Sequence, residues 1–162
     1  MAKQAEEKTN VMRVLDSKKV VYKHYCYADT DAVSGMEVAG VLGQNPNQVF
    51  KTLVTTGKTN AHYVFVIPVN QELNLKAAAK AVGEKSIEML KSKDLLGLTG
   101  YIHGGCSPIG MKKFFTTVID QSAENFDTIL FSAGKIGYQV EVSLADLQKV
   151  IRFSLAAITE SF

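Results

Sequence analysis

The feature that most constrains this chain is a short apolar segment, residues 48–54, with a single lysine near its middle. The segment is rich in valine, phenylalanine, threonine and leucine and follows Pro46-Asn47, which is typical of a β-strand after a turn. Side chains alternate across a strand, so the two faces carry Val49, Lys51 and Leu53 on one side and Phe50, Thr52 and Val54 on the other. Both faces are mainly apolar, which indicates a strand that is buried on both sides.

Lys51 is the exception in this strand, because burying an unpaired ammonium group is costly. Its side chain can extend to water along its own methylene groups, or its charge can belong to a structural ion pair. The charge can instead face a bound ligand. The spacing alone favours the two structural explanations, and the choice stays open at this point.

The 162 residues are expected to form one domain, residues 9–162, behind a frayed N-terminal segment, residues 1–8. Apolar residues make up 46% of the chain and charged residues 21%, which is ordinary for a soluble globular protein. The formal net charge of +2 is too small to indicate a surface that coats nucleic acid, although it allows a local basic patch.

Cysteine usage and the N-terminus predict a cytoplasmic protein. Neither Cys26 nor Cys106 belongs to a CxxC pair, which fits free thiols in a reducing compartment. The N-terminal residues are polar and lack the apolar region of a signal peptide. No apolar run approaches the roughly 20 residues that a membrane-spanning helix needs, so no membrane partner is expected.

Capping signals and apolar periodicity predict the other elements. Helices are expected to begin after Thr9 or Asn10, at the Ser34–Glu37 capping box, after Asn74, near Ser92 and after Ser143, and to stop near Lys18, Gly43, Gly83 and Gly97. Further strands are expected over 20–27, 62–67, 86–90, 115–120, 128–132 and 138–142. Together they predict an α/β (α+β) fold, whose mixed, mostly antiparallel sheet curls into a β-barrel surrounded by helices.

A second notable segment, residues 101–110, contains three glycines and a proline and cannot form a regular element. Glycines let backbone N–H groups approach a ligand closely, and such loops often hold anions or carbonyl oxygens. The alternative is a tight structural turn, which is the commoner explanation for an isolated motif of this kind.

The sequence contains no zinc-protease motif, no paired Cys/His cluster and no phosphate-binding loop. His24, His62 and His103 fall on different elements, so the sequence does not support a metal site, and no cofactor is expected. Cys106, inside the glycine-rich segment, could act as a nucleophile if its thiol were activated. Ser107 lacks the GxSxG surroundings of a hydrolase nucleophile.

Three motifs in a fixed order resemble the YbaK family of aminoacyl-tRNA deacylases, which is similar to the editing domain inserted in bacterial prolyl-tRNA synthetases. They are Phe50-Lys51-Thr52, then Gly104-Gly105-x-Ser107-Pro108-x-Gly110 with Lys112-Lys113, and Ser132-x-Gly134-Lys135. The resemblance extends from about Thr9 to Ile151 and is greatest to the free-standing Cys-tRNA(Pro) deacylases. Each motif is weak alone, but the ordered set is specific.

The resemblance implies a mixed β-barrel ringed by helices. The implied activity is trans-editing, the hydrolytic removal of a wrongly attached amino acid from tRNA, chiefly cysteine from tRNA(Pro). Whether cysteine is also removed from tRNA(Cys) stays open. The implied partners are the acceptor end of aminoacyl-tRNA and prolyl-tRNA synthetase. In the family's cysteine editors, the thiol of the substrate itself attacks the ester carbonyl, so the protein need not supply a nucleophile.

The resemblance also assigns site residues. Lys51 matches the family's essential lysine, and the segment around Gly104 matches the loop that holds the aminoacyl end. The other residues expected to bind substrate are Tyr25 or Tyr27, Thr52, Gly105, Ser107, Pro108, Gly110, Ser132 and Gln139. A length difference in the following loop leaves the choice between the two tyrosines open. Lys51 and the amides of Gly104 and Gly105 would position the ester carbonyl and stabilise its developing negative charge.

Three positions depart from the family's pattern. Gln139 stands where cysteine-specific members of the family often carry an acidic residue. Ser34 replaces the aromatic residue that family members carry before the second helix, and Cys106 occupies a position that is usually apolar in the family. These departures concern the amino-acid specificity more than the type of reaction. Two alternatives therefore stay open: an Ala-tRNA(Pro) deacylase, and a non-catalytic relative that binds aminoacyl-tRNA or a synthetase.

Overall fold

The computed structural model describes residues 8–161, so all but the last residue of the segment expected to be frayed lies outside the described residues. The helices are α1 (Asn10–Ser17), α2 (Gly35–Leu42), α3 (Leu75–Val82), α4 (Ser92–Thr99) and α5 (Leu144–Leu147), with a 3₁₀ turn, η1 (Gln121–Asn125). The strands are β1 (Lys23–Cys26), β2 (Phe50–Gly57), β3 (His62–Pro68), β4 (Gln71–Leu73), β5 (Ile87–Met89), β6 (Thr116–Asp120), β7 (Ile129–Ser132), β8 (Tyr138–Val142), β9 (Ser154–Ala156) and β10 (Thr159–Ser161).

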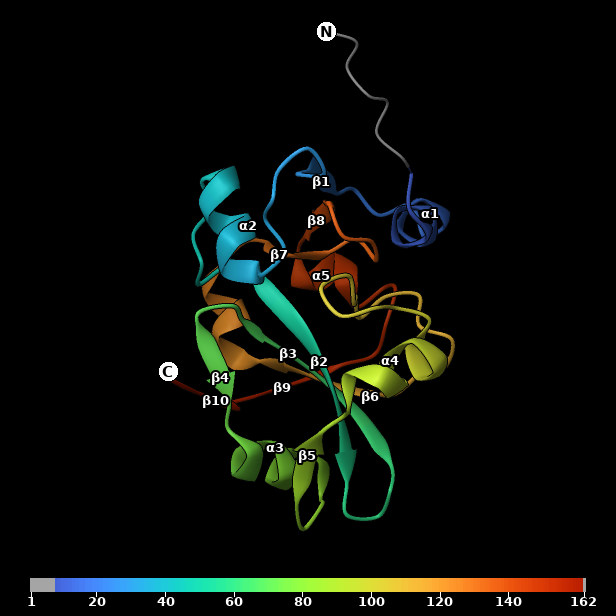
Figure 1. Cartoon of the computed structure of the whole chain (residues 1–162), viewed down its shortest axis with the longest axis vertical. Coiled ribbons are helices and arrows are strands. Elements are labelled where there is room, and N and C mark those ends of the chain that lie inside the picture. The colour runs from blue at the N-terminus through green and yellow to red at the C-terminus, as the bar shows by residue number, and fades with distance from the viewer. Residues whose placement is uncertain (1–7, 162) are drawn as a thin grey trace, which may run out of the picture.

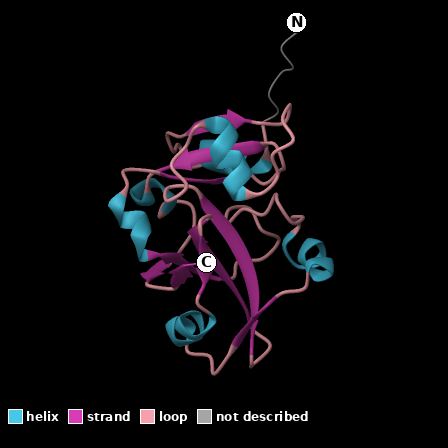
Figure 2. Cartoon of the chain, turned by 60° about the vertical axis from the view of Figure 1, so that its left-hand side comes forward, coloured by secondary structure: helices cyan, strands magenta, loops and turns pink. Residues whose placement is uncertain are grey.

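The strands form three sheets (Figure 1). The central sheet has the order β5-β2-β3-β6-β9, a smaller sheet has the order β1-β8-β7, and β10 pairs with β4. β6 runs parallel to both β3 and β9, whereas the remaining pairs are antiparallel, which confirms a mixed, mostly antiparallel arrangement. Figure 2 shows the helices on the outside of these sheets.

The expected barrel is wrong, because none of the sheets within residues 8–161 closes on itself. β3 pairs with β2 from Phe50 to Thr56, but β5 pairs with β2 only from Thr55 to Gly57. The first half of β2 therefore has an open edge. The central and smaller sheets meet beside this edge at a single bridge, between Val49 and Leu130.

The predicted caps start four of the helices. The side chains of Thr9, Ser34, Asn74 and Ser143 accept hydrogen bonds from backbone N–H groups in the first turns of α1, α2, α3 and α5. α4 continues past the predicted stop at Gly97 and ends before Gly100, which has a φ of +87°. The helix tolerates Gly97 because Leu95 and Thr99, on either side of it, are buried and anchor both turns.

The core lies on both faces of β3, which confirms that this strand is central. Val64 and Val66 pack into the larger cluster, with α1 and the smaller sheet. Phe65 and Ile67 point the other way, into a second cluster that includes Ala78 of α3. No helix in the described part of the chain is long and apolar enough to cross a lipid bilayer.

Asp120 connects the end of β6 to the C-terminal strands. Its carboxylate is buried and accepts hydrogen bonds from the N–H groups of Ile158 (3.1 Å) and Ser122 (3.2 Å). We expect Asp120→Ala to leave these donors without an acceptor and to lower the free energy of unfolding by about 2–4 kcal/mol. Urea and thermal unfolding followed by circular dichroism would measure the loss. The exposed Asp127→Ala is the control, with an expected change within about 0.5 kcal/mol; equal stability of the two variants would contradict this role.

Candidate functional site

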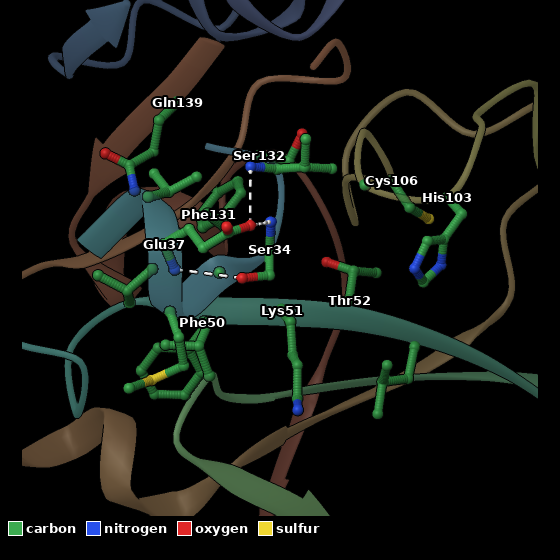
Figure 3. A pocket seen from close by; sticks show the side chains of 18 of the residues that line it. Ser34, Glu37, Phe50, Lys51, Thr52, His103, Cys106, Phe131, Ser132 and Gln139 are labelled. Carbon is green, nitrogen blue, oxygen red and sulfur yellow. Dashed lines mark hydrogen bonds between the residues drawn. The ribbon is translucent and has the colours of Figure 1, made fainter. Parts of the chain in front are cut away.

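A cavity of about 840 Å³ borders the open edge of β2. Its walls come from β2, the start of α2, the segment from β5 into α4, the glycine-rich loop, and the strands β7 and β8 (Figure 3). Segments far apart in the sequence meet here because the smaller sheet packs beside the central sheet without closing onto it. The cavity therefore lies between the two sheets, beside the open edge of β2.

Lys51 and Thr52 enter the cavity from opposite faces of β2 (Figure 3). This follows from the alternation of side chains along a strand. Residues from both faces line one cavity because it wraps around the edge of the strand. A ligand that contacts both side chains must therefore lie across this edge.

The peptide groups of β2 also face the cavity at alternate residues. The carbonyl oxygen of Val54 accepts a hydrogen bond from the N–H of Leu90 (3.0 Å), on the side away from β3. In an antiparallel strand, the N–H and C=O groups of a residue point to the same side and alternate along the chain. The peptide group of Thr52 therefore points to the open side, where β5 no longer pairs.

Lys51 is half-buried, and its burial lowers the pKa of its ammonium group below that of an ordinary lysine. The negative charge of Glu72, on β4, partly opposes this shift. The ion-pair explanation and the ligand-facing explanation therefore each have a counterpart in the structure, because Lys51 interacts electrostatically with Glu72 and also lines a cavity.

Thr52 presents a hydroxyl group to this region. Its Oγ1 is buried and has no hydrogen-bond partner within residues 8–161. A buried hydroxyl without a partner costs stability, and native proteins usually keep such a group for a reason. A ligand in the cavity could supply the missing hydrogen bond.

Only part of the glycine-rich loop lines the cavity. Gly104 lies in its wall, with a φ of +89°. The N–H of Gly105 donates to the carbonyl of Ile102 (3.0 Å), and a Cβ at Gly105 would lie 3.1 Å from the backbone nitrogen of Ile136. Gly105 thus allows the loop to pack against the turn between β7 and β8, and its N–H is committed to the loop itself.

The other predicted residues of this loop form its scaffold. Ser107 is fully buried, and its Oγ accepts a hydrogen bond from the N–H of Ile109 (3.3 Å). Pro108 and Gly110 border a separate, small cavity of about 100 Å³. The hydroxyl of Tyr101 donates to the carbonyl of Ile109 (2.5 Å) and so holds this part of the loop in place.

The structure distinguishes the two candidate tyrosines. Tyr27 lines the cavity, whereas the hydroxyl of Tyr25 donates to the carboxylate of Glu141 (2.5 Å). Ser132, at the end of β7, also lines the cavity, and its Oγ accepts a hydrogen bond from the N–H of Gly134 (3.1 Å).

Gln139 forms a neutral part of the wall and is 2% exposed. Its side-chain amide makes a reciprocal pair with that of Gln44, at 2.7 Å in one direction and 3.0 Å in the other. Gln44, just after α2, was not predicted as a site residue, because no local motif signals a pair 95 residues apart.

Two further side chains, Cys106 and His103, lie together on the loop side of the cavity (Figure 3). Burial raises the pKa of the Cys106 thiol to about 12, so the thiol stays protonated at neutral pH. Within residues 8–161, histidine, cysteine and acidic side chains nowhere form a group of three that could hold a metal ion.

The fold has a match among solved structures. A structure described as a trans-editing enzyme for prolyl-tRNA synthetase superposes with a TM-score of 0.79 at 20% identity, over 93% of this chain and 95% of that chain. This similarity establishes an editing-domain-like fold. The family model of the aminoacyl-tRNA editing domain matches residues 30–150, about three quarters of the sequence.

Relatives identified by sequence agree with this class. EbsC of Enterococcus faecalis, named as a Cys-tRNA(Pro)/Cys-tRNA(Cys) deacylase, is 47% identical over 158 residues, which are 97% of this chain and 96% of EbsC. A proline–tRNA ligase of Pelobacter propionicus is 26% identical over 108 residues, 67% of this chain but 19% of the ligase. The chain belongs to the aminoacyl-tRNA editing domain family, which confirms the resemblance found in its motifs.

The raised pKa of Cys106 predicts slow alkylation. At pH 8, a pKa of about 12 leaves about one thiol in ten thousand ionised, and only the thiolate reacts with iodoacetamide. We expect the half-buried Cys26 to be labelled first, and labelling of Cys106 to increase about tenfold per pH unit up to pH 10 without levelling. Mass spectrometry of the native protein measures both rates, with protein unfolded in urea as the control. Labelling of Cys106 that levels near pH 7 would instead indicate an activated thiol.

Proposed function

We propose that this protein is a trans-editing aminoacyl-tRNA deacylase that removes mischarged cysteine from tRNA(Pro), with Cys-tRNA(Cys) as a second substrate. The main support is the 47% identity to EbsC over nearly the whole of both chains. The cavity supports the same reading, because it brings Lys51, Thr52, Gly104 and Ser132 to one open strand edge.

In the proposed reaction, the substrate supplies the nucleophile. The sulfur of the esterified cysteine forms a bond to its own carbonyl carbon, and the bond from that carbon to the ribose oxygen breaks. The ribose oxygen takes up the proton that the thiol releases, which frees the tRNA. The product is a cyclic thioester of cysteine, which water then opens to cysteine.

The protein contributes position and charge to this reaction. The ammonium group of Lys51 stabilises the negative charge that develops on the carbonyl oxygen. Gly104 lets the aminoacyl end approach the loop closely, and Thr52 offers its hydroxyl and its edge-facing N–H group. The N–H of Gly105 takes no part in this scheme, because it is bonded to Ile102.

Cys106 is a poor candidate for the nucleophile. Its thiol lines the cavity, but burial keeps it protonated, and the thiolate is the reactive form. A thiol carried by the substrate needs no such residue. The burial of this cysteine is consistent with a role in packing alone.

We further propose that the protein acts in the cytoplasm and obtains tRNA identity from prolyl-tRNA synthetase. A net charge of +2 gives little general attraction to the tRNA backbone, so the cavity would bind mainly the acceptor end. The similarity to part of a proline–tRNA ligase is consistent with a shared tRNA substrate.

Replacing Lys51 tests the reaction. We expect Lys51→Ala to lower the rate of Cys-tRNA(Pro) deacylation about 10²–10³-fold, as loss of one oxyanion-stabilising group typically does. Lys58→Ala is the matched control, since Lys58 is an exposed lysine just after the same strand. Ala-tRNA(Pro) is assayed in parallel, because hydrolysis of that ester would require a nucleophile other than a substrate thiol. Tight tRNA binding without loss of either amino acid would establish a binding role instead.

The two threonines of β2 provide a second test. Thr52→Val removes a hydroxyl without a partner, so we expect unchanged or higher stability and a turnover about 5- to 30-fold lower. Thr55→Val removes a hydroxyl that donates to the carbonyl of Tyr63 (3.0 Å), so we expect lower stability and near-normal turnover at a temperature where the variant is folded. Unfolding curves and single-turnover assays on both variants separate these effects. Normal turnover of Thr52→Val would exclude the Thr52 hydroxyl from catalysis.

A further inference from the structure

Among the described residues that line the cavity, Glu37 is the only one with an acidic side chain. It lies in the first turn of α2, and in Figure 3 its carboxylate is beside Ser34, on the Thr52 side of β2. Lys51 leaves the strand on the opposite face (Figure 3). The two charged groups therefore approach the open edge of β2 from different sides.

The carboxylate of Glu37 is held in place by the capping box. Its Oε1 accepts hydrogen bonds from the N–H groups of Ser34 (3.1 Å) and Val33 (3.3 Å). Both of these backbone hydrogen bonds fall on Oε1, so Oε2 can accept a hydrogen bond from a ligand. The N–H of Ser34, followed by that of Val33, holds the pKa of Glu37 below its ordinary value, so the group is charged at neutral pH.

The proposed substrate has an amino group whose positive charge a carboxylate could bind. An amino acid esterified to tRNA keeps a free α-amino group, and a carboxylate beside this group favours its protonated, positively charged form. This ammonium lies two bonds from the ester carbonyl, so a carbonyl placed near Lys51 brings a second positive charge into the cavity. Gln139 cannot neutralise that charge, because its side chain is an amide paired with Gln44.

We propose, on the basis of the deacylase function above, that Oε2 of Glu37 binds the α-ammonium group of the aminoacyl ester. Glu37 thereby serves as a substrate-binding residue as well as the cap of α2. This contact selects esters with a free α-amino group. Aminoacyl-tRNAs whose α-nitrogen is acylated, which include peptidyl-tRNAs, lack the ammonium and are poor substrates.

The test compares Cys-tRNA(Pro) with N-acetyl-Cys-tRNA(Pro), each corrected for its spontaneous hydrolysis. Because Glu37 is exposed in the free protein, we expect the wild type to prefer the free α-amine in kcat/KM by about 3- to 5-fold, as for an ion pair that water partly screens. Glu37→Gln keeps an oxygen that can cap the helix but removes the charge. It should raise KM for Cys-tRNA(Pro), leave the acetylated substrate almost unaffected and bring the preference close to one.

Two variants separate recognition from structure. Glu37→Asp keeps the charge and should restore part of the preference, whereas Ser34→Ala weakens the capping box but should retain the wild-type preference. Equal losses on both substrates in Glu37→Gln, or a wild type that does not distinguish them, would overturn the inference while leaving the deacylase intact. A wild type inactive on both substrates would overturn the proposed function itself.

Discussion

The open edge of β2 is the constraint on which the rest of this structure depends. An unpaired strand edge exposes backbone donors and acceptors, and proteins usually pair or cover it. Here β5 pairs only with the end of β2, so the start of α2, the glycine-rich loop and the smaller sheet surround the remainder. Apart from the bridge between Val49 and Leu130, these elements surround the edge without pairing with it. The incomplete closure of the sheets thus leaves room for the cavity beside β2.

This edge also explains how charges are distributed around the cavity. Because neighbouring side chains leave a strand on opposite faces, Lys51 and Thr52 reach the same space from two directions. Glu37 approaches from the Thr52 side, and the pair of Gln139 with Gln44 keeps the far wall neutral. The cavity therefore has a positive side and a negative side at one strand edge. A substrate with a polarised carbonyl and an adjacent cation fits this separation of charge.

Local signals in the sequence predicted much of the fold but not its closure. The Ser34–Glu37 capping box and the stop at Gly83 depend on residues a few positions apart, and the structure contains both. Closure of the barrel depends instead on where β5 stops pairing with β2, which no local pattern encodes. The cavity residues show the same division. Lys51 stands out because it interrupts an apolar strand. Glu37 was explained by the capping box alone, so its place in the cavity wall was not predicted.

The environment of Cys106 suggests why a reaction driven by a substrate thiol would need Lys51. Burial in this wall raises the pKa of the Cys106 thiol to about 12, and a substrate thiol in the same surroundings would resist ionisation in the same way. A nearby ammonium group opposes that effect, because forming a thiolate beside a cation costs less than forming it alone. The same burial that lowers the pKa of Lys51 also strengthens its interaction with any anion in the cavity. Water would screen the charge of a fully solvated lysine, so such a lysine would stabilise the thiolate and the oxyanion less than a half-buried one does. On the proposed function, the half-buried position of Lys51 would therefore be a requirement of the chemistry.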